Sequence, residues 1–345
     1  MRRYLEIAVQ LQSECGELPP GTRLPGEREL AVRFGVATPT IRQALRVLKD
    51  SGLLVRKIGS GTYTAGSCSN RSTIGVLVSG CRYSEIFAVM CREISHEAER
   101  HQMLTLIRDA SCEDLERTAD RTRELARELV ASRVSGVIYQ PVQFATSAFR
   151  TNCAVLDLFA SAHIPVTVID CELAECPIKL SYDIVSIDNF SAGQELATWL
   201  VQTGSRHICF QACPGYGASV ADRIRGVRDV CHGIMPVLVL EPDDRAAVRR
   251  VLLENPAMDT VICQNDLAAV RLAEAFRELG RAVPGDIRVA GFDGVLASEK
   301  AGIPTMKQPC EDLARGALSC LLERMAHPTS SAMRLLRHAR LLPRG

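Results

Sequence analysis

The sequence predicts a small helical domain with a two-stranded sheet, followed by a larger α/β domain with parallel sheets. Three observations lead to this division. The first 66 residues hold ten Lys and Arg against six Asp and Glu, whereas the chain of 345 residues has a net charge of only +1. Two short helical patterns meet at Gly35 within this basic segment. From residue 73 onward, strand and helix patterns alternate, as they do in sheets covered by helices on both faces.

The basic segment has the pattern of a helix, a helix–turn–helix and a two-stranded wing. Apolar residues at helical spacing, including Tyr4 and Leu11, predict the first helix. A second helix starts at Pro25-Gly26 and ends at Gly35, where glycine supplies a left-handed turn. We expect Thr38 to cap a third helix, and "LVRKIGSGTYTAG" to form two short strands around a Gly-Ser-Gly turn. Together these elements make a winged helix.

The third predicted helix has one apolar and one polar face. Ile41, Ala44, Leu45 and Leu48 share the first face, and Arg42, Gln43 and Arg46 share the second. A helix in this position enters the major groove of DNA, where arginine reads guanine and glutamine pairs with adenine. Small residues in the wing let its backbone approach a groove or phosphates. On helical spacing alone, a three-helix protein-interaction module is an equal alternative.

The larger domain is predicted as alternating strands and helices. The predicted strands are 73–80, 104–110, 134–141, 164–170, 183–189, 207–212, 235–241, 259–265 and 287–293; the predicted helices are 87–102, 114–133, 155–163, 191–204, 219–231, 245–256 and 267–280. Such a pattern builds parallel sheets, and ligands bind at the carboxyl ends of their strands.

Several classes of protein are excluded by what the sequence lacks. No apolar run reaches the length of a membrane span, and polar residues such as Glu6 and Gln10 interrupt any secretory core. The fourteen cysteines are scattered without C-x-x-C or zinc-ligand spacing, so we expect a reducing cytoplasm and no metal site. No G-x-G-x-x-G follows the first strand of the larger domain, and no P-loop or nucleophile elbow is present. We therefore expect neither a cofactor nor an enzyme.

Residues 19–64, from "PPGTRLPGERELAVRFGVATPTIRQALRVLKDSGLL" to "GSGTYT", closely resemble the DNA-binding domain of GntR-family regulators. The resemblance implies that Arg28 and Arg42 are the main DNA arginines and that Gly59–Gly61 is the wing tip. The DNA-binding set is predicted as Arg3, Arg28, Thr38, Thr40, Arg42, Gln43, Lys57, Gly59 and Gly61. The family pattern has Ser at Gly26 and Ala37 and Arg at Thr38, so an untypical operator sequence is expected.

Residues 73–343 resemble the sensor of LacI-type regulators, a relative of periplasmic sugar-binding proteins. The motifs that carry this are "RVSGVIY", "IPVTVID", "ADRIRGVRD", "VICQNDLAAVRLAEAFRELG", "VPGDIRVAGFDG" and "TMKQP", in this order. The resemblance implies a type I periplasmic-binding-protein-like fold with two lobes joined by three crossovers. The expected parts are a winged helix at 1–66, a linker at 67–72 and a sensor at 73–345, with lobes of about 73–184 plus 309–327 and about 185–308 plus 328–343. This combination is that of the arabinose-repressor branch of GntR regulators.

By the same resemblance, the cleft between the lobes holds an effector. The motifs place Asp170, Arg223, Asn265, Asp293 and Gln308 there, and either Tyr83 or Phe87 could stack on a sugar face or belong to the core. Charged and amide groups suit a polyol, whose hydroxyls both donate and accept hydrogen bonds. Cys171 stands where the family often has Arg, so the resemblance does not predict which sugar binds. Asp188 and Asp266 fit the ends of helices better than a ligand site.

These observations predict a sequence-specific DNA-binding transcriptional repressor whose operator affinity is controlled by a small polar effector, a sugar. One winged helix reads few bases, so a homodimer on a near-palindromic site of double-stranded DNA is expected. The segment "FAVMCREISHEAER" is a candidate interface, although its apolar residues fit a core equally well. The alternative is a transport-type sugar-binding protein, which would need a signal peptide and has no use for a winged helix.

Overall fold

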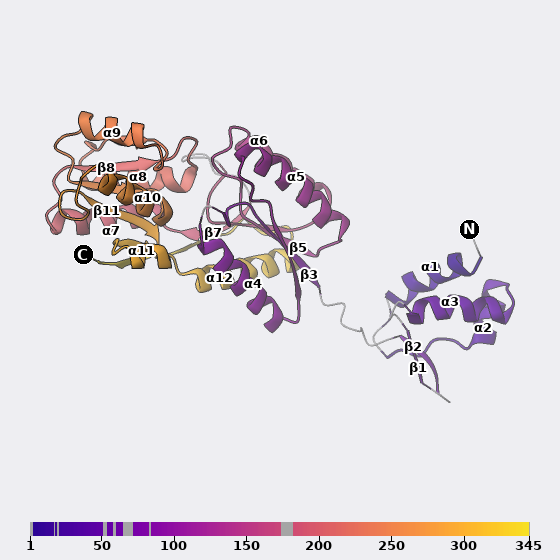
Figure 1. Ribbon diagram of the computed structural model, residues 1–345. Helices are drawn as coiled ribbons and strands as arrows, with labels where there is room; N and C mark the ends of the chain where they lie inside the picture. The colour runs from indigo at the N-terminus through magenta and orange to yellow at the C-terminus, as the bar shows by residue number, and fades with distance from the viewer. Residues whose placement is uncertain are drawn as a thin grey trace. The chain divides into compact units, whose positions relative to one another are not determined.

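The computed structural model describes residues 3–16, 18, 21–50, 54–57, 60–64, 72–82, 84–173 and 182–344. The chain divides into two compact units, Met1–Arg71 and Ser72–Gly345, which are described separately (Figure 1). The predicted linker at 67–72 lies at this division, and all of it except Ser72 is outside the described residues. No helix in the described part is both long enough and apolar enough to cross a membrane.

The N-terminal unit contains three helices and a small sheet, as predicted. Its elements are α1 (Arg3–Gly16), α2 (Glu27–Phe34), α3 (Thr38–Asp50), β1 (Leu54–Lys57) and β2 (Gly61–Thr64). Their shared core is formed by residues at helical spacing, with Ile7, Leu11, Leu30, Ile41 and Leu48 almost fully buried. Burial of these side chains provides most of the favourable free energy that holds the three helices together.

Two details of this unit differ from the prediction. Thr38 is the first residue of α3 and not its cap, because the helix begins one residue earlier than the Thr-Pro pair suggests. The wing also receives a third segment, since Leu24 N donates to Thr62 O (2.9 Å) and Thr64 N donates to Thr22 O (2.8 Å). Residues 22–24 therefore line the free edge of β2 and cover it.

The first sheet of the larger unit has six strands in the order β13-β7-β6-β5-β3-β4, all parallel. They are β3 (Thr73–Val78), β4 (Leu104–Asp109), β5 (Gly136–Tyr139), β6 (Val166–Ile169), β7 (Asp183–Ile187) and β13 (Arg334–Arg337). Helices α4 (Ile86–Arg100) and α12 (Cys310–Ala326) pack on one face. Helices α5 (Leu115–Ala131) and α6 (Ala148–Ser161) pack on the other face. This sheet with its four helices is the first lobe.

The second sheet has the order β14-β12-β11-β10-β8-β9 and is parallel except for β14. Its strands are β8 (Ile208–Ala212), β9 (Val237–Val239), β10 (Thr260–Cys263), β11 (Arg288–Asp293), β12 (Thr305–Lys307) and β14 (Arg340–Leu342). Its helices are α7 (Asn189–Gln202), α8 (Ala218–Val230), α9 (Arg245–Glu254), α10 (Asp266–Glu278) and the short α11 (Leu296–Lys300). The pair α7 and α8 covers one face and the pair α9 and α10 the other, which completes the second lobe.

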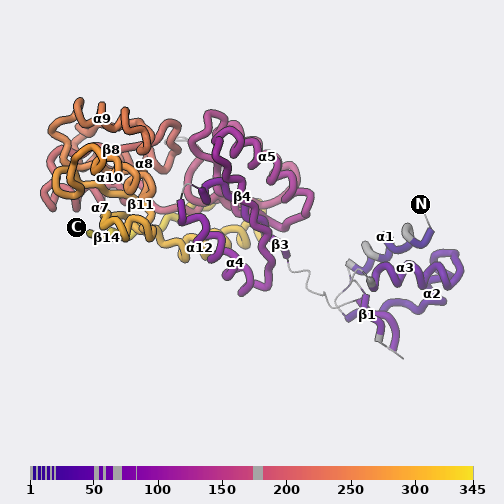
Figure 2. The backbone as a smooth tube through the Cα atoms, in the orientation of Figure 1, coloured from indigo at the N-terminus to yellow at the C-terminus, as the bar shows by residue number. Residues whose placement is uncertain are grey.

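The chain crosses between the lobes three times, as the resemblance implied, but two boundaries differ from the prediction. The first crossover follows Ile187 instead of residue 184, because β7 pairs with β6 through residues 183–185 and with β13 through residues 184–187. Residues 334–337 belong to the first lobe, where Arg334 also forms an ion pair with Glu172. Only after them does the chain return to the second lobe as β14 (Figure 2).

Two glycines allow α7 and α8 to pack at very short distance. A Cβ on Gly226 would lie 2.0 Å from Phe190 O, and one on Gly193 would lie 2.4 Å from Arg223 O. These contacts are with backbone, which cannot move aside without shifting a helix. They fix α8, and with it the side chain of Arg223, against α7.

We predict that Gly226→Ala lowers the free energy of unfolding of the larger unit by roughly 2–3 kcal/mol, because overpacking outweighs the helix propensity that alanine adds. Urea denaturation of the two proteins measures this. Gly285→Ala is the control, since this exposed glycine has the Ala282 side chain 3.2 Å from its Cβ position and no backbone close by. Equal unfolding midpoints for Gly226→Ala and the unchanged protein would contradict the prediction.

Candidate functional site

The predicted DNA-reading residues of α3 lie on the exposed face of that helix. Arg42, Gln43 and Arg46 are exposed, while Ile41 and Ala44 are buried against the core. Arg42 Nε donates to Glu27 Oε2 at 2.7 Å, and the Arg42 side chain is 66% exposed. Glu27 lies at the start of α2 and therefore orients Arg42 without burying it.

The other predicted DNA residues are distributed over the same unit. Arg3 and Arg28 are exposed, on α1 and α2, and Thr38 and Thr40 are half-buried in the first turn of α3. Gly61 begins β2 with φ +126°, a left-handed conformation that favours glycine. Gly59 and the side chain of Lys57 lie outside the described residues.

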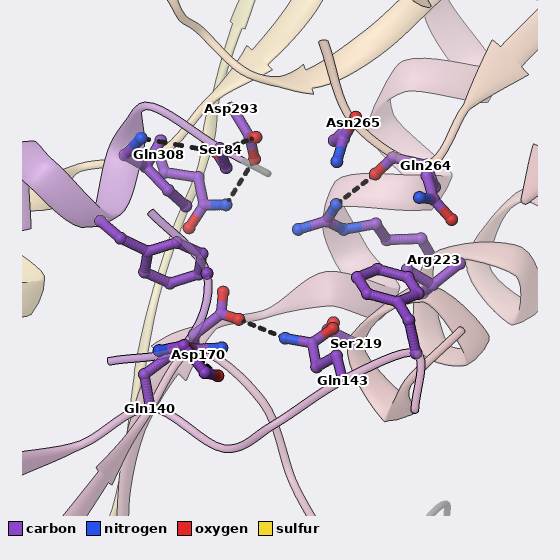
Figure 3. A pocket seen from close by; sticks show the side chains of 16 residues that line it. Ser84, Gln140, Gln143, Asp170, Ser219, Arg223, Gln264, Asn265, Asp293 and Gln308 are labelled. Carbon is purple, nitrogen blue, oxygen red and sulfur yellow. Dashed lines mark hydrogen bonds between the residues drawn. The ribbon is translucent and has the colours of Figure 1, made fainter. Parts of the chain in front are cut away.

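A polar cavity lies between the two lobes, where the strands of both sheets end (Figure 3). It is lined by Ser79, Gly80, Ser84, Ile86, Phe87, Gln140, Gln143, Phe144, Asp170, Ser219, Val220, Arg223, Gln264, Asn265, Asp293 and Gln308. The cavity therefore brings together six of the seven residues predicted to contact an effector. The seventh, Tyr83, lies outside the described residues.

Arg223 extends from α8 into this cavity and is 4% exposed. Its Nε donates to Asn189 Oδ1 (2.8 Å) and its Nη1 donates to Gln264 O (2.6 Å). The guanidinium also lies over the ring of Phe292, with 4.5 Å from Cζ to the ring centroid. Figure 3 shows the remaining end of the guanidinium directed into the cavity.

Asp170 follows β6 and faces the cavity from the first lobe. Its φ of +76° turns the chain at the strand end, and its Oδ2 accepts a hydrogen bond from Gln143 Nε2 at 2.9 Å. Burial raises the pKa of Asp170 to about 6, against the opposing effect of Arg223 and with a further increase from Asp293. Its carboxyl group therefore changes charge close to neutral pH.

Asp293 occupies the opposite side of the cavity, at the end of β11, with φ +119°. Ser84 Oγ donates to its Oδ2 (2.7 Å), and Gln308 Nε2 donates to its Oδ1 (2.9 Å). Burial raises its pKa, while the nearby guanidinium of Arg223 and these two hydrogen bonds lower it. Because Ser84 belongs to the first lobe, the Ser84–Asp293 bond joins the lobes directly.

Three other polar residues of the motifs have structural contacts. Asn265 lines the cavity but its Oδ1 also caps α10 by accepting from Ala268 N at 2.9 Å. Asp188 caps α7 through Ser191 N (3.0 Å), which confirms the structural reading of that residue. Asp266 is fully buried behind the cavity, where Ser298 Oγ and Thr305 Oγ1 each donate to it at 2.6 Å.

Phe87 contributes an apolar wall to the cavity from the first turn of α4. It is 5% exposed, and a Cβ at Gly80 would lie 2.4 Å from its ring, so the ring packs directly over this glycine. Phe87 is thus a core residue and a cavity residue at once. The two alternatives offered by the sequence do not exclude each other.

Sequence reasoning missed several residues of the cavity. Gln140 and Gln264 directly follow buried strands, and the expectation that ligands bind at the carboxyl ends of parallel strands could have found them. Gln143 and Phe144 lie in a loop where Phe144 has φ +67°, and no pattern in the sequence marks them. Ser84 lies in the first loop of the sensor, where the sequence suggested the neighbouring Tyr83 instead.

Comparisons with known proteins match both units. Residues 9–64 match the bacterial regulatory proteins of the gntR family, and residues 200–345 match the periplasmic binding protein-like domain. The arabinose metabolism transcriptional repressor of Geobacillus stearothermophilus is 26% identical over 344 residues, which is 93% of this chain and 90% of that protein.

Two solved structures show the same fold. The regulator CelR in complex with cellobiose has a TM-score of 0.67 and 19% identity, covering 93% of this chain and 99% of its own. A LacI-family regulator from Enterococcus faecium with bound ribose has a TM-score of 0.60 and 23% identity, covering 79% of this chain and 97% of its own.

The chain thus joins a GntR-type helix–turn–helix domain to a two-lobed periplasmic-binding-protein-like domain, which is the construction of a ligand-controlled DNA-binding regulator. Both family resemblances seen in the sequence are confirmed. Over nearly its whole length the chain is similar to the arabinose metabolism transcriptional repressor.

We predict that the affinity of the cavity for a polyol falls as the pH drops through about 6. The ionised carboxylate of Asp170 accepts hydrogen bonds from hydroxyls, and protonation, at a pKa of about 6, removes this acceptor charge. Affinity should therefore be constant above about pH 7 and decrease by up to about tenfold per pH unit below 6. Calorimetric titration between pH 5 and 8 measures the polyol affinity as a function of pH. In the Asp170→Asn variant this affinity should depend little on pH. A pH-independent affinity in the unchanged protein would refute this role of Asp170.

Proposed function

We propose that this protein is a sequence-specific transcriptional repressor that releases its operator when a carbohydrate effector binds between the two lobes. The observation that carries the proposal is the polar cavity, whose side chains come from both lobes of a chain that also contains a winged helix. A ligand in that place contacts both lobes at once. The similarity to a protein named as an arabinose metabolism transcriptional repressor supports repression as the action on DNA.

The winged helix supplies the DNA contacts of this proposal. The exposed face of α3 would enter the major groove with Arg42 and Gln43 directed at base edges, and Arg3 and Arg28 would neutralise phosphates or read bases beside it. A homodimer doubles the number of bases read and gives the operator its two-fold symmetry. A transport-type binding protein would have no use for this unit.

The effector would act by changing the relative angle of the lobes. Asp170 lies in the first lobe, Arg223 and Asp293 in the second, and Gln308 at the second crossover. A sugar held by all four stabilises one lobe angle over others, and only such a difference in affinity between two arrangements can shift an equilibrium. The altered angle would reset the spacing of the two winged helices in the dimer.

The proposal is tested by titrating the full-length protein onto DNA from upstream of its own gene and the neighbouring genes, with and without a panel of sugars. Fluorescence anisotropy should show tight binding to one of these fragments and its release by at least one sugar. If the protein binds DNA but no sugar alters this binding, the proposed control by a carbohydrate is contradicted. If the protein binds none of the fragments more tightly than random DNA, the proposed sequence-specific binding of an operator in this region is contradicted.

We predict that Arg42→Ala weakens operator binding by about 1–3 kcal/mol, because a base contact of its guanidinium is lost. Effector binding should not change. Arg33→Ala is a matched control, since Arg33 is an exposed arginine of the same unit and, like Arg42, is paired with a carboxylate, Glu14 of α1 (2.9 Å), but is not among the predicted DNA-binding residues. Mobility-shift titration compares the three proteins, and equal affinity of Arg42→Ala and the unchanged protein would exclude Arg42 from the DNA contact.

We predict that Arg223→Ala weakens effector binding by roughly 1.5–3 kcal/mol, since it removes a charged hydrogen-bond donor. Operator binding without effector should survive, so the variant should repress at effector concentrations that release the unchanged protein. Arg223→Lys keeps the charge and serves as a second variant if the alanine leaves Asn189 and Gln264 without their donor and the lobe unfolds. Release at the same effector concentration in all three proteins would place the sensing site elsewhere.

A further inference from the structure

We propose that Glu116, a residue of α5 outside the cavity, positions the loop 142–147 of the first lobe so that it contacts the loop 213–217 of the second lobe. The first loop lies between β5 and α6, and the second lies between β8 and α8. Their contact connects the lobes in addition to the Ser84–Asp293 hydrogen bond. The proposal goes beyond the proposed function, because it concerns what holds the lobes together before any effector binds.

The two loops approach each other at very short distance. A Cβ on Gly215 would lie 2.7 Å from Phe144 O, and one on Gly217 would lie 3.1 Å from Gln143 Oε1. Gly215 has φ +72° and Phe144 has φ +67°, so both chains turn sharply where they meet. A side chain at position 215 would push the two loops apart, and the contact therefore depends on the placement of both backbones.

Gln143 links this contact to the cavity (Figure 3). Its Oε1 faces Gly217, and its Nε2 donates to Asp170 Oδ2 at 2.9 Å. One side chain thus reaches the second lobe with its oxygen and a carboxylate of the first lobe with its nitrogen. A displacement of the loop would separate Gln143 from at least one of these partners.

Asn152 of α6 fixes the beginning of the loop. Its Oδ1 accepts from Tyr139 OH (2.6 Å) and from Val142 N (2.9 Å), and its Nδ2 donates to Val142 O (3.0 Å). Asn152 is 3% exposed and Tyr139 is fully buried, so these hydrogen bonds lie in a region of low dielectric. They fix Val142 relative to β5.

Glu116 fixes the other end of the loop. Its Oε1 accepts from Thr146 N and Thr146 Oγ1, both at 2.7 Å, and its Oε2 accepts from Ser147 Oγ. Ser147 precedes α6 but its side chain does not cap that helix. The carboxylate of Glu116 lies there instead, where negative charge is favoured. Hydrogen bonds from Ser147 and Thr146 lower the pKa of Glu116 to about 2, so the carboxylate is ionised at neutral pH.

The placement of Gln143 and Phe144 depends on these two ends, because both residues are only half-buried. Glu116 is suited to a test of this dependence. Glu116 and Thr146 are exposed and Ser147 is half-buried, so water can replace the hydrogen bonds that a substitution removes. We therefore expect a Glu116 variant to fold.

Hydrogen exchange, followed by mass spectrometry on the full-length protein without ligand or DNA, tests the proposal. Glu116→Ala should speed exchange in 142–147 about threefold to tenfold, as expected for the loss of a hydrogen bond. It should also speed exchange in 213–221 of the second lobe, where Val220 N and Ala221 N donate to Gly217 O. The substitution changes no atom of that segment, so a purely local role of Glu116 would leave its exchange unaltered.

Two further variants on α5 complete this comparison. Glu116→Gln keeps one acceptor oxygen for Thr146 and should restore most of the protection in both segments. Glu124→Ala is the matched control, since Glu124 is an exposed glutamate of the same helix whose carboxylate pairs with Arg121 at 3.2 Å. Its exchange pattern in both segments should equal that of the unchanged protein.

A variant in the second lobe tests the contact from the opposite side. Gly215→Ala should speed exchange in 142–147, because the added Cβ would displace Phe144 O. Gly204→Ala is its control: Gly204 has φ +109°, but a Cβ there would meet nothing within 4 Å in the described part of the chain. It carries the strain of a left-handed alanine without the contact, and exchange in 142–147 should not change.

The outcomes decide the proposal without reference to DNA or sugars, so they are independent of the proposed function. Unchanged exchange in 213–221 of Glu116→Ala, or in 142–147 of Gly215→Ala, would overturn it. Exchange in α9 and β10 should stay the same in Glu116→Ala. A rise there as large as that in 213–221 would mean that Glu116 supports the fold in general, and this result would also overturn the proposal.

Discussion

Three ionisable side chains, Asp170, Asp293 and Arg223, are buried together in one cavity, and much of the surrounding structure offsets the cost of keeping them there. A buried charge is tolerated only where it is paired and hydrogen-bonded. The glutamines at 143 and 308 and the serine at 84 supply donors to the carboxylates, while Asn189 and the backbone of Gln264 accept from the guanidinium. The close packing of α7 on α8 at Gly193 and Gly226 then fixes the arginine in place.

The same arrangement explains why the cavity can act as a sensor. Its groups are divided between two lobes, so their mutual distances depend on the lobe angle. Ser84 and Asp293 are in contact across the division in this structure, and a sugar hydroxyl that competed for Asp293 would alter the energy of that contact. In the proposed mechanism, ligand binding and lobe angle would therefore be coupled through a few hydrogen bonds between the two sheets.

The sequence predicted the buried parts of the fold better than its exposed parts. Central strands such as β5 and β10 are short runs of apolar residues between polar segments. A run of this length and composition favours a buried strand. The elements from α11 onward were not assigned. Strands β12 and β14 have three residues each and β13 has exposed positions such as Leu336, but α12 has 17 residues with apolar positions at helical spacing and could have been predicted. The crossover after β7 was predicted at residue 184, inside the strand. All residues of β7 are buried up to Ile187, so the first lobe extends to that residue.

The cavity was predictable to the extent that its residues follow strands or belong to family motifs. Asp170, Arg223, Asn265, Asp293 and Gln308 fulfil one of these conditions, and the structure places all five at the cavity. Gln143 and Phe144 reach it through a loop with a left-handed residue, which is a property of backbone conformation and not of composition. Likewise, the covering of β2 by residues 22–24 depends on contacts between distant segments.

The last crossover has a consequence for the synthesis of the protein. Each sheet receives a strand from the segment 334–342: β13 extends the first sheet beyond β7, and β14 extends the second beyond β12. While the chain is being translated, both β7 and β12 therefore present unpaired edges until this segment has left the ribosome, whereas the N-terminal unit has all its elements much earlier. The winged helix can fold during translation, but the sheets of the two lobes are completed together and late.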